Sequence, residues 1–521
     1  MRRSACRRCN SGEIPPCRRP INLRYSITLR VGLVREKKLS RSVSELSRVS
    51  DSTVFVLYGA TGDLARRMVL PAFFRLAQAG LLPPDWRLIG NGRGAVSHQE
   101  FQARVHDALT EFGPQPHDGP WEQFCSRLRF AGGGFSADNP GSLPEILADA
   151  ERELGGHPQR VHYFAVPPTA FETLTRGLGR HGLAAQSRVV YEKPFGTSMD
   201  SFRALDRVVH EVLDESQVFR IDHFLGKEAT QDLYAARFGN ELFSGVWDRE
   251  HVAMVQVDVP EVLDVAERAA FYDGTGAILD MLVTHLFQVV AEVAMEPPAS
   301  FDAEDLAAAR EAVIGAFRPL QPAEVVLGQF AGYRDIESVA EDSRTETFVA
   351  ARLWVDTARW RGVPFLLRTG KQMAASRQQV KLMFRQPAAP VPELPAPGNV
   401  LTFDLAGEGE LDLSLIVKEP GPTLTLSTAR TSLPLRTVPG AHPLPPYVRL
   451  IHDVLLGDRS LFTRPDGLEH VWEVAAAVLA DKPEPAIYPK GSWGPAEADR
   501  LAAPIGWLLN SPDEAESTQV G

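Results

Sequence analysis

The stretch TVFVLYGATGDLARR, residues 53–67, decides the fold of this chain. Its unbroken apolar run from Val54 to Tyr58 is typical of a strand that is buried on both faces of a sheet. A glycine turn follows, and apolar residues then recur at helical spacing as far as Leu76. Pro71 falls inside that helical pattern, so we expect it to bend or split the helix.

More runs of the same kind continue the pattern along the first part of the chain. Apolar runs lie around residues 87–89, 160–168 and 187–196, and a helical stretch lies near 171–178. Strands that alternate with helices in this way predict an α/β fold. Its sheet is expected to be Rossmann-like, parallel and doubly wound, over residues of about 53–220.

The pattern of apolar residues changes beyond Ala229. Strand-like runs follow, several of them with alternating polarity, and they predict an α+β domain with a large, mostly antiparallel sheet. The expected helices of this domain lie around 271–293 and 303–317, and a proline-rich loop is expected at 387–397. The predicted division of the chain is a basic extension (1–50), a dinucleotide-binding domain (51–225), a second domain (226–511) and a flexible tail (512–521).

The turn after the first strand has the form G-x-x-G-x-x-A. Gly59 permits a tight turn, and Gly62 lets backbone N–H groups approach a pyrophosphate at the start of the helix. Many strand-to-helix turns use glycine for structural reasons alone, but the flanking strand and helix favour a coenzyme site.

An NAD site usually has an acid near the end of the second strand. Arg93 stands there instead, which favours NADP over NAD unless Arg93 is an ordinary solvated loop residue.

Composition narrows the class of protein. The 521 residues are 44% hydrophobic and 23% charged, which is ordinary for a soluble globular protein. Residues 1–50 carry 13 Lys or Arg and three Glu, so their net charge is about +10. The net charge of the whole chain is −11, so the remaining residues carry about −21. An acidic body argues against nucleic acid as the main partner. No apolar run is long enough to span a bilayer, so no membrane association is expected.

The cysteines are concentrated in the basic head. Cys6, Cys9 and Cys17 lie there, and only Cys125 lies in the body. One body cysteine predicts no disulfide framework and fits a reducing cytoplasm. The spacing of Cys6 and Cys9 could hold zinc, but no fourth ligand is evident. We therefore interpret the head as a disordered extension, which also lacks the long apolar core of a secretory signal.

Several stretches together resemble the glucose-6-phosphate dehydrogenase family. They occur in the family's order and cover residues of about 54–507. The stretches are GATGDLARR, YEKPFG, RIDHFLGKE, RFGNELFSGVW, ERAAFYDGTGAILDM, TETFVAARLWVDTARWRGVPFLLRTGK, YVRLIHDVLLGD and GSWGP. So many ordered motifs make a chance match very improbable.

The resemblance implies a Rossmann-like coenzyme domain and a substrate domain whose sheet mediates assembly into a homodimer or homotetramer. It also implies NADP-dependent oxidation of glucose 6-phosphate to 6-phosphoglucono-1,5-lactone, which opens the oxidative pentose phosphate pathway. Carried over by motif, His285 is the general base and Asp222 is its carboxylate partner. The implied substrate-binding residues are Lys193, His223, Lys227, Glu261, Asp280, Lys371 and Arg377. The implied coenzyme-binding residues are Gly59, Thr61, Gly62, Asp63, Leu64, Arg93 and Lys193.

The chemistry of such a reaction agrees with these residue types. Oxidation at C1 removes a hydroxyl proton while hydride leaves the carbon, and histidine is the natural base near neutral pH. A neighbouring carboxylate fixes the imidazole tautomer. No metal is expected, because no hydrolytic water must be activated. The alternative for His285 is a hydrogen-bonded core residue. On an ideal α-helix Asp280 would lie about 140° from His285, so the two could serve one cleft only from its two sides.

A sugar phosphate needs a site for a dianion. His223 and Lys227 are four residues apart, so they share a face if the local structure is helical. Two cationic donors at that spacing suit a phosphate. The alternative is that both side chains simply solvate a charged turn.

Four departures from the family's pattern cluster around substrate positions. Phe224 replaces a usual tyrosine and removes a hydroxyl directed at the phosphate. Ser376 stands where some relatives carry a second phosphate-binding cation, which Arg377 could supply. The segment around Ala406 lacks an arginine and a sugar-binding glutamine, and Thr284 replaces a common asparagine before the base.

These departures leave three hypotheses for the function. The main hypothesis is a glucose-6-phosphate dehydrogenase with weakened affinity for its substrate. The second is the same hydride transfer on another hexose or hexose phosphate. The third is a non-catalytic paralogue that acts as a regulatory subunit, and the retained Asp222, His285 and Lys193 argue against it.

Overall fold

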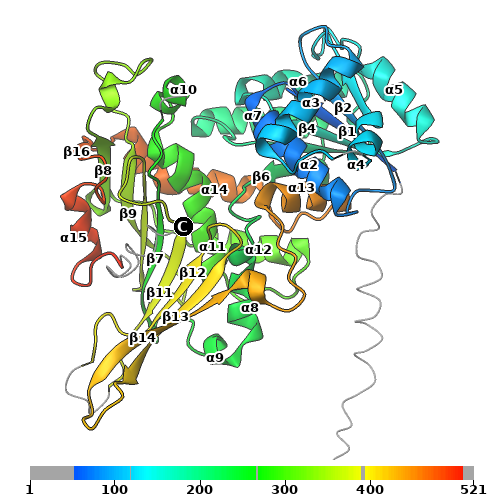
Figure 1. Ribbon diagram of the computed structural model, residues 1–521. Coiled ribbons are helices and arrows are strands. Elements are labelled where there is room, and N and C mark those ends of the chain that lie inside the picture. The colour runs from blue at the N-terminus through cyan, green and yellow to red at the C-terminus, as the bar shows by residue number, and fades with distance from the viewer. Residues whose placement is uncertain (1–51, 118, 266–267, 389–393, 509–521) are drawn as a thin grey trace, which may run out of the picture. The chain divides into compact units, whose positions relative to one another are not determined.

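A computed structural model of the chain describes residues 52–117, 119–265, 268–388 and 394–508. Figure 1 draws these residues in colour. They belong to one compact unit, residues 47–521. The predictions for the basic head (1–50), its three cysteines and the tail (512–521) lie outside the described residues.

The first sheet is parallel except at one edge. Its order is β15-β6-β5-β4-β1-β2-β3, and only the pair β15–β6 is antiparallel. Its strands are β1 (Ser52–Tyr58), β2 (Asp85–Asn91), β3 (Leu128–Ala131), β4 (Gln159–Phe164), β5 (Ser187–Tyr191), β6 (Val218–Ile221) and β15 (Phe462–Thr463). The predicted parallel, doubly wound sheet is confirmed.

Helices cover both faces of this sheet because successive residues of β1 point to opposite sides. Val54 and Val56 pack in one core with α5, α6 and α7, while Phe55 and Leu57 pack in another with α2, α3, α4 and α13. These helices are α2 (Leu70–Gln78), α3 (His98–Phe112), α4 (Pro120–Ser126), α5 (Leu143–Glu153), α6 (Phe171–Arg180), α7 (Met199–Val212) and α13 (Pro446–Leu456).

The expected disturbance at Pro71 is a change of helix type. The chain leaves the glycine turn as a π-helical segment, η1 (Ala65–Val69), and continues as α2 with Pro71 in its first turn. Because the helical conformation is already established before Pro71, its missing N–H leaves a carbonyl of the preceding turn without its usual donor. The helix therefore changes form just before Pro71.

The second sheet is mixed but mostly antiparallel. Its order is β14-β13-β12-β11-β7-β10-β9-β8-β16, with parallel pairs only at β7–β10 and β8–β16. Its strands are β7 (Val252–Pro260), β8 (Val325–Phe330), β9 (Phe348–Trp354), β10 (Pro364–Gly370), β11 (Gln379–Phe384), β12 (Val400–Asp404), β13 (Glu410–Lys418), β14 (Leu426–Pro434) and β16 (Ala486–Tyr488). The predicted large sheet is confirmed, with β8 and β16 as strands that we did not predict.

The helices of the second part include one of unexpected type. The helical run predicted at 271–293 forms in three pieces, of which the middle one, η5 (Ile278–Leu286), is a π-helix. The helices are α8 (Glu228–Gly239), α9 (Glu241–Ser244), α10 (Ala269–Asp273), α11 (Phe287–Ala294), α12 (Ala303–Ile314), α14 (Pro465–Ala480) and α15 (Asp499–Ala502). Short 3₁₀ helices are η2 (Pro168–Ala170), η3 (Glu215–Gln217), η6 (Pro322–Glu324), η7 (Tyr333–Asp335), η8 (Leu435–Thr437) and η9 (Ala496–Ala498).

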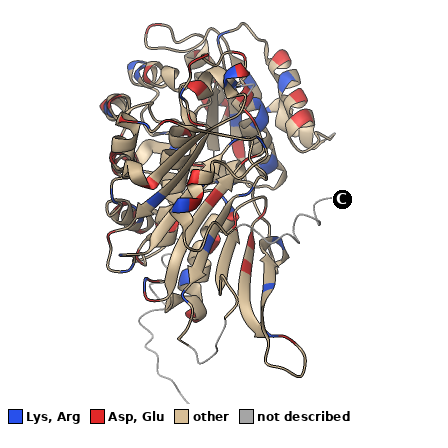
Figure 2. Cartoon of the chain, turned by 90° about the vertical axis from the view of Figure 1, so that its left-hand side faces the viewer, with Lys and Arg blue, Asp and Glu red and all other residues tan. Residues whose placement is uncertain are grey.

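Charged residues of both signs are spread along the described elements (Figure 2). Figure 2 shows Lys and Arg interspersed with Asp and Glu along the helices and strands rather than gathered on one element. Within the described ranges, no helix combines the length and the apolar character needed to cross a membrane.

Candidate active site

The site forms where the carboxyl ends of β5 and β6 meet η5. Lys193 follows β5 and Asp222 follows β6, so both lie at the edge of a parallel sheet where ligands usually bind. His285 comes from η5, 63 residues after Asp222 in sequence. The fold thus brings together three residues that the resemblance had assigned to one site.

Asp222 and His285 form a buried pair. Nδ1 of His285 lies 2.6 Å from Oδ1 of Asp222, and their side chains are 0% and 1% exposed. Oδ1 also accepts a hydrogen bond from the backbone N–H of Phe224 at 2.9 Å, which orients the carboxylate. A proton on Nδ1 leaves the lone pair of the neutral ring on Nε2. That Nε2 is buried and has no hydrogen-bond partner among the described residues.

The surroundings keep this imidazole neutral. Burial lowers the pKa of His285 below its ordinary value of 6.5, and the positive charge of Lys193 lowers it further. Asp222 acts in the opposite direction, because its carboxylate stabilises the imidazolium. A neutral imidazole with an unpaired Nε2 can accept a proton near neutral pH.

Lys193 and Asp280 form a second pair beside the first. Nζ of Lys193 donates to Oδ1 of Asp280 at 3.0 Å and to the Asp280 carbonyl at 2.9 Å. Burial would raise the pKa of Asp280, but the ammonium groups of Lys193 and Lys371 outweigh it and hold that pKa well below the usual range. The carboxylate of Asp280 is therefore charged and fixes the position of the Lys193 ammonium.

The expected geometry of Asp280 and His285 is wrong. We predicted about 140° between them from an ideal α-helix. In the π-helical η5, backbone hydrogen bonds join residues five apart, so residues separated by five lie nearly above one another. Asp280 and His285 therefore lie on the same side of η5, where the charge of Asp280 influences the pKa of His285.

Glu261 and Lys371 meet at the ends of two parallel neighbours. Glu261 follows β7 and Lys371 follows β10, whose last residues pair in register. Their side chains form an ion pair. Nζ of Lys371 also lies 5.8 Å from the ring centroid of Tyr272, whose buried hydroxyl has no hydrogen-bond partner within the described part of the chain. We did not single out Tyr272, although it belongs to the family-like stretch ERAAFYDGTGAILDM.

His223 and Lys227 lie in a turn and not in a helix, so the reason we gave for their shared face is wrong. The turn nevertheless places Lys227 near His285: its Nζ lies 5.1 Å from the ring centroid of Phe224, whose ring centroid lies 4.8 Å from that of His285. The ring of His223 lies 4.5 Å from the His285 ring. Burial lowers the pKa of His223, and the neighbouring His285 lowers it further.

Lys227 has few partners of its own. Its ammonium donates to the carbonyl of Leu405 at 3.1 Å. Burial lowers the pKa of Lys227 to about 8, although the charges of Asp404 and Asp222 oppose the shift. The segment after β12, which contains Ala406, thus lies beside the predicted phosphate-binding lysine, and its backbone is held by the Asp404 carboxylate, which accepts from the Ala406 N–H at 2.9 Å.

The remaining predicted substrate residues lie after β10. The Arg377 guanidinium lies 5.3 Å from a ring centroid of Trp493, and its buried Nη1 has no hydrogen-bond partner among the described residues. Oγ of Ser376 accepts from the backbone N–H of Val262 at 3.0 Å. Since Val262 follows Glu261, both residues lie near the Glu261–Lys371 ion pair, but the guanidinium of Arg377 packs on an aromatic ring.

A buried acid next to Lys193 is a further feature that we did not predict. Glu192 accepts hydrogen bonds from the hydroxyls of Tyr163 at 2.5 Å and Tyr447 at 3.4 Å. Burial raises the pKa of Glu192 to about 7. The ring of Tyr447 also stacks on that of His223, with centroids 6.5 Å apart. Tyr447 lies in the stretch YVRLIHDVLLGD, which resembles the family. The resemblance assigns no role to Tyr447, so its contacts with Glu192 and His223 become apparent only from the fold.

The turn between β1 and η1 fits a dinucleotide. Gly59 has a φ of +71°, and a Cβ there would lie 2.3 Å from the carbonyl oxygen of Ala165, so only glycine is compatible with this close approach. Its N–H donates to the Asn91 carbonyl at 3.0 Å, and the Gly62 N–H donates to the Gly59 carbonyl at 2.8 Å. The turn is thereby fixed at the carboxyl edge of the sheet.

The predicted side chains around this turn lie on the surface. Thr61 is exposed and lines a pocket with Arg66 and Arg104. Asp63 is exposed and pairs with Arg67 at 2.7 Å, and Leu64 is the residue from which η1 begins. Arg93 is exposed, two residues beyond the end of β2. All of them therefore lie at or next to the same sheet edge.

One cluster has the residue types of a metal site. Asp222, His223 and His285 each offer a ligand atom within 4.8 Å of the others. Because Nδ1 of His285 and Oδ1 of Asp222 bind each other, we interpret the cluster as a proton-transfer group. The expectation that no metal takes part remains a prediction.

Sequence models of two protein-family domains match the chain. The glucose-6-phosphate dehydrogenase NAD binding domain matches residues 56–232, and the glucose-6-phosphate dehydrogenase C-terminal domain matches residues 234–507. The chain is 37% identical over 494 residues to glucose-6-phosphate 1-dehydrogenase 2 of Mycobacterium tuberculosis, covering 89% of this chain and 94% of the relative. It is 37% identical over 475 residues to glucose-6-phosphate 1-dehydrogenase of Gluconobacter oxydans, covering 87% and 96%.

Solved structures give the same result. A glucose-6-phosphate dehydrogenase in complex with its substrate glucose-6-phosphate superposes with a TM-score of 0.82 at 30% identity, over 88% of this chain and 98% of that one. The glucose-6-phosphate 1-dehydrogenase of Mycobacterium avium superposes with a TM-score of 0.78 at 30% identity, over 88% and 99%.

Proposed function

This chain belongs to the glucose-6-phosphate dehydrogenase family, and we propose that it oxidises glucose 6-phosphate at C1 to 6-phosphoglucono-1,5-lactone with NADP as the coenzyme. One observation carries the proposal for this chain's own residues. Nε2 of His285 is buried and without a protein partner among the described residues, while Nδ1 is held by Asp222. This is the arrangement that a general base requires.

In the proposed reaction, Nε2 of His285 accepts the proton of the C1 hydroxyl group. The Asp222 carboxylate holds the ring in the correct tautomer and stabilises the imidazolium that forms. The Lys193 ammonium, fixed by Asp280, orients the sugar beside the base. The bound nicotinamide coenzyme supplies the acceptor for the hydride that leaves C1.

The other predicted residues are proposed to bind the two ends of the substrate. Lys227 and His223 bind the phosphate, and Glu261 and Lys371 bind sugar hydroxyls. Two cationic or donor groups in one turn support the phosphate role. The ion pair at the ends of β7 and β10 supports the sugar role, because it presents fixed polar atoms next to Asp280.

We propose NADP over NAD because Arg93 stands beyond β2 where an acid would bind a ribose 2′-hydroxyl. An Arg93→Ala variant tests this. We expect the ratio of kcat/KM for NADP to that for NAD to fall about tenfold or more, since a hydrogen bond to a charged group contributes about 1.5–3 kcal/mol. An unchanged ratio would assign the selectivity to other residues.

The proposed assembly is a homodimer or homotetramer in the cytoplasm. Exposed apolar side chains on and near the outer strands β13 and β14 support self-association, because such a row on a sheet edge is typical of an interface. They are Leu415, Val417, Leu424 and Leu433. Light scattering on the purified protein measures the oligomer size, and a monomer at micromolar concentration would contradict the proposal.

Reduction of NADP and NAD across a panel of hexoses and hexose phosphates is the decisive experiment. The proposal expects turnover on glucose 6-phosphate above all other sugars. Faster turnover on another sugar would support a changed substrate, for which the sparse contacts of Lys227 are the structural argument. No turnover on any sugar would support the regulatory paralogue.

A further inference from the structure

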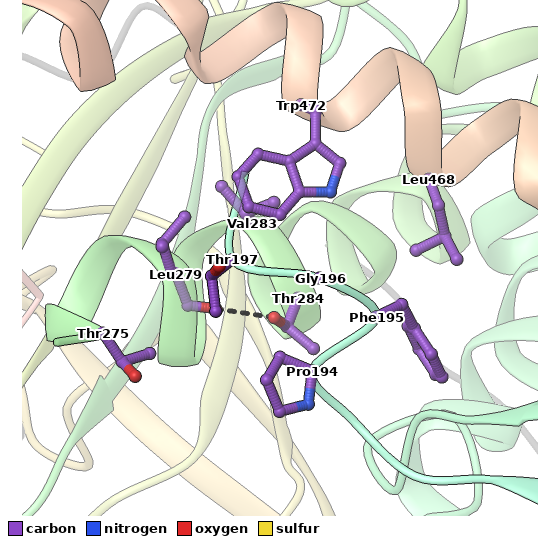
Figure 3. Close-up of a pocket in the computed structure, with 10 residues that line it drawn as sticks. All are labelled: Pro194, Phe195, Gly196, Thr197, Thr275, Leu279, Val283, Thr284, Leu468 and Trp472. Carbon is purple, nitrogen blue, oxygen red and sulfur yellow. Dashed lines mark hydrogen bonds between the residues drawn. The ribbon is translucent and has the colours of Figure 1, made fainter. Parts of the chain in front are cut away.

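Thr284 makes an unusual hydrogen bond immediately before the proposed base. Its hydroxyl donates to the carbonyl of Leu279, five residues earlier, at 2.6 Å (Figure 3). Thr and Ser hydroxyls in an α-helix normally bond to carbonyls three or four residues earlier. A bond to the fifth carbonyl matches the π-helical register instead. The same span recurs at the end of η5, where the Phe287 N–H donates to the Leu282 carbonyl.

An apolar pocket surrounds this hydrogen bond. Figure 3 shows Thr284 and Leu279 on η5 facing the loop after Lys193 on one side and α14 on the other. The lining residues are Pro194, Phe195, Gly196, Thr197, Thr275, Leu279, Val283, Thr284, Leu468 and Trp472. Because the wall is mostly apolar, the Thr284 hydroxyl has few competing partners there, and a hydrogen bond in such a setting is stronger than in water.

The register of η5 decides where two site residues point. In the π-form Asp280 and His285 lie on one side of the helix, and each binds a partner from the first sheet. In an α-helical register they would be about 140° apart. One of the two contacts, with Lys193 or with Asp222, would then have to break.

We propose that Thr284 is a positioning residue for His285. Its hydroxyl holds η5 in the π-form and so keeps His285 against Asp222 while Asp280 holds Lys193. This inference rests on the proposed function and adds a residue to its machinery. Thr284 itself touches neither substrate nor coenzyme in this account and acts only through the helix.

A matched set of variants tests the proposal. Thr284→Val keeps the shape and removes the hydroxyl, and we expect kcat to fall about ten- to a hundredfold, since small displacements of a catalytic group have effects of that size. KM for glucose 6-phosphate should change less than kcat, because the proposed phosphate-binding residues lie on another segment. Thr284→Ser should restore most of the activity.

Thr275→Val is the control. Thr275 lines the same pocket, and its hydroxyl donates to the carbonyl of Phe271 at 2.9 Å, four residues earlier and before η5 begins. We expect Thr275→Val to keep the wild-type kcat. In a His285→Asn background, Thr284→Val should cause no further loss, because both changes disable the same group.

A second readout separates this inference from the proposed function. The Nδ1 proton shared by His285 and Asp222 should give a low-field proton resonance, which Thr284→Val should shift or abolish and Thr284→Ser should keep. If wild type shows no turnover of glucose 6-phosphate, the proposed function fails, and this resonance still tests the role of Thr284. Wild-type kcat and an unchanged resonance in Thr284→Val would overturn the inference, as would an equal loss of kcat in Thr275→Val.

Discussion

The two ends of the proposed substrate site are held in different ways. At the proton-accepting end, Asp222 and His285 are fully buried, bonded to each other and fixed by a backbone N–H. At the phosphate end, Lys227 is only half-buried, and its ammonium donates to one backbone carbonyl and lies over the ring of Phe224. The first end is preorganised by the protein, whereas the second depends on one half-buried cation that is held by a single hydrogen bond and an aromatic ring.

Because of this difference, we expect the proton-accepting end to control the rate of the chemical step and the phosphate end to control the affinity for substrate. Preorganised groups around a reacting atom lower the barrier because they need not reorganise during the reaction. Binding groups that contact a remote phosphate change KM more readily than the chemical step. Changes at the proposed phosphate end can therefore alter substrate affinity without disturbing the proposed base.

The largest effect is expected at the proton-accepting end. His285→Asn should lower kcat about 10²- to 10⁴-fold, the usual contribution of a general base, with little change in KM. Steady-state reduction of NADP measures it. His251→Asn is a suitable control, because the side chain of His251 is exposed, lies just before β7 begins and pairs with Asp248. A His285→Asn enzyme as fast as its parent would falsify the assignment of the base.

Removal of the cation proposed to bind the phosphate should have the opposite effect on kcat and KM. Lys227→Gln should raise KM for glucose 6-phosphate about ten- to a hundredfold, because a charged hydrogen bond of about 1.5–3 kcal/mol is lost. The kcat should stay within about threefold of wild type. Lys418→Gln, at an exposed lysine on β13, serves as the control. If kcat falls as much as KM rises, the two ends of the site are not separable.

A hydroxyl group introduced at residue 224 should strengthen substrate binding at the phosphate end instead of weakening it. Phe224→Tyr should lower KM for glucose 6-phosphate by about tenfold if the new hydroxyl binds the phosphate. The catalytic step should be little affected, although the ring packs against His285. An unchanged KM would show that the tyrosine position does not explain the affinity of this enzyme.

The smallest expected effect is a dependence on pH. The pKa of Lys227 is lowered to about 8, so the side chain is charged below that pH and neutral above it. KM for glucose 6-phosphate should therefore rise by somewhat less than about tenfold between pH 7.5 and 9, as the phosphate loses its cation. Lys227→Arg should remove this rise, because arginine remains charged. A rise of the same size in Lys227→Arg would assign it to another group.

Most of the fold was predictable because its signals are local. Apolar runs between helical stretches predicted β1, β2, β4 and β5 of the first sheet, and strand-like runs predicted most of the second. The strands β8 and β16 were not predicted. β16 has only three residues, and β8 shows no alternation of polarity because all its residues are buried. Such strands are defined by the partners they pair with and not by their own pattern.

The sequence selected residues that the fold brings together, but it did not predict how they are arranged. The family resemblance selected Asp222 and His285, but their contact spans 63 residues, and no periodic pattern reports a contact of that kind. The relation of Asp280 to His285 was wrong because we assumed the α-helical period, whereas η5 follows the π-helical one. Tyr272 and Glu192 were missed because burial next to a charged group becomes visible only in three dimensions.

The short strand β15 has a consequence for how the protein is made. Residues Phe462 and Thr463 pair with β6, and α13 packs on the same sheet, so the edge of the first sheet is closed by a late part of the chain. A chain that leaves the ribosome from its N-terminus must wait until about 240 residues after β6 have been synthesised before this edge is complete. During that interval β6 presents an open edge to other chains. Asp222, which follows β6, therefore gains its final support only near the end of translation, so a product of premature termination should be inactive and prone to aggregate.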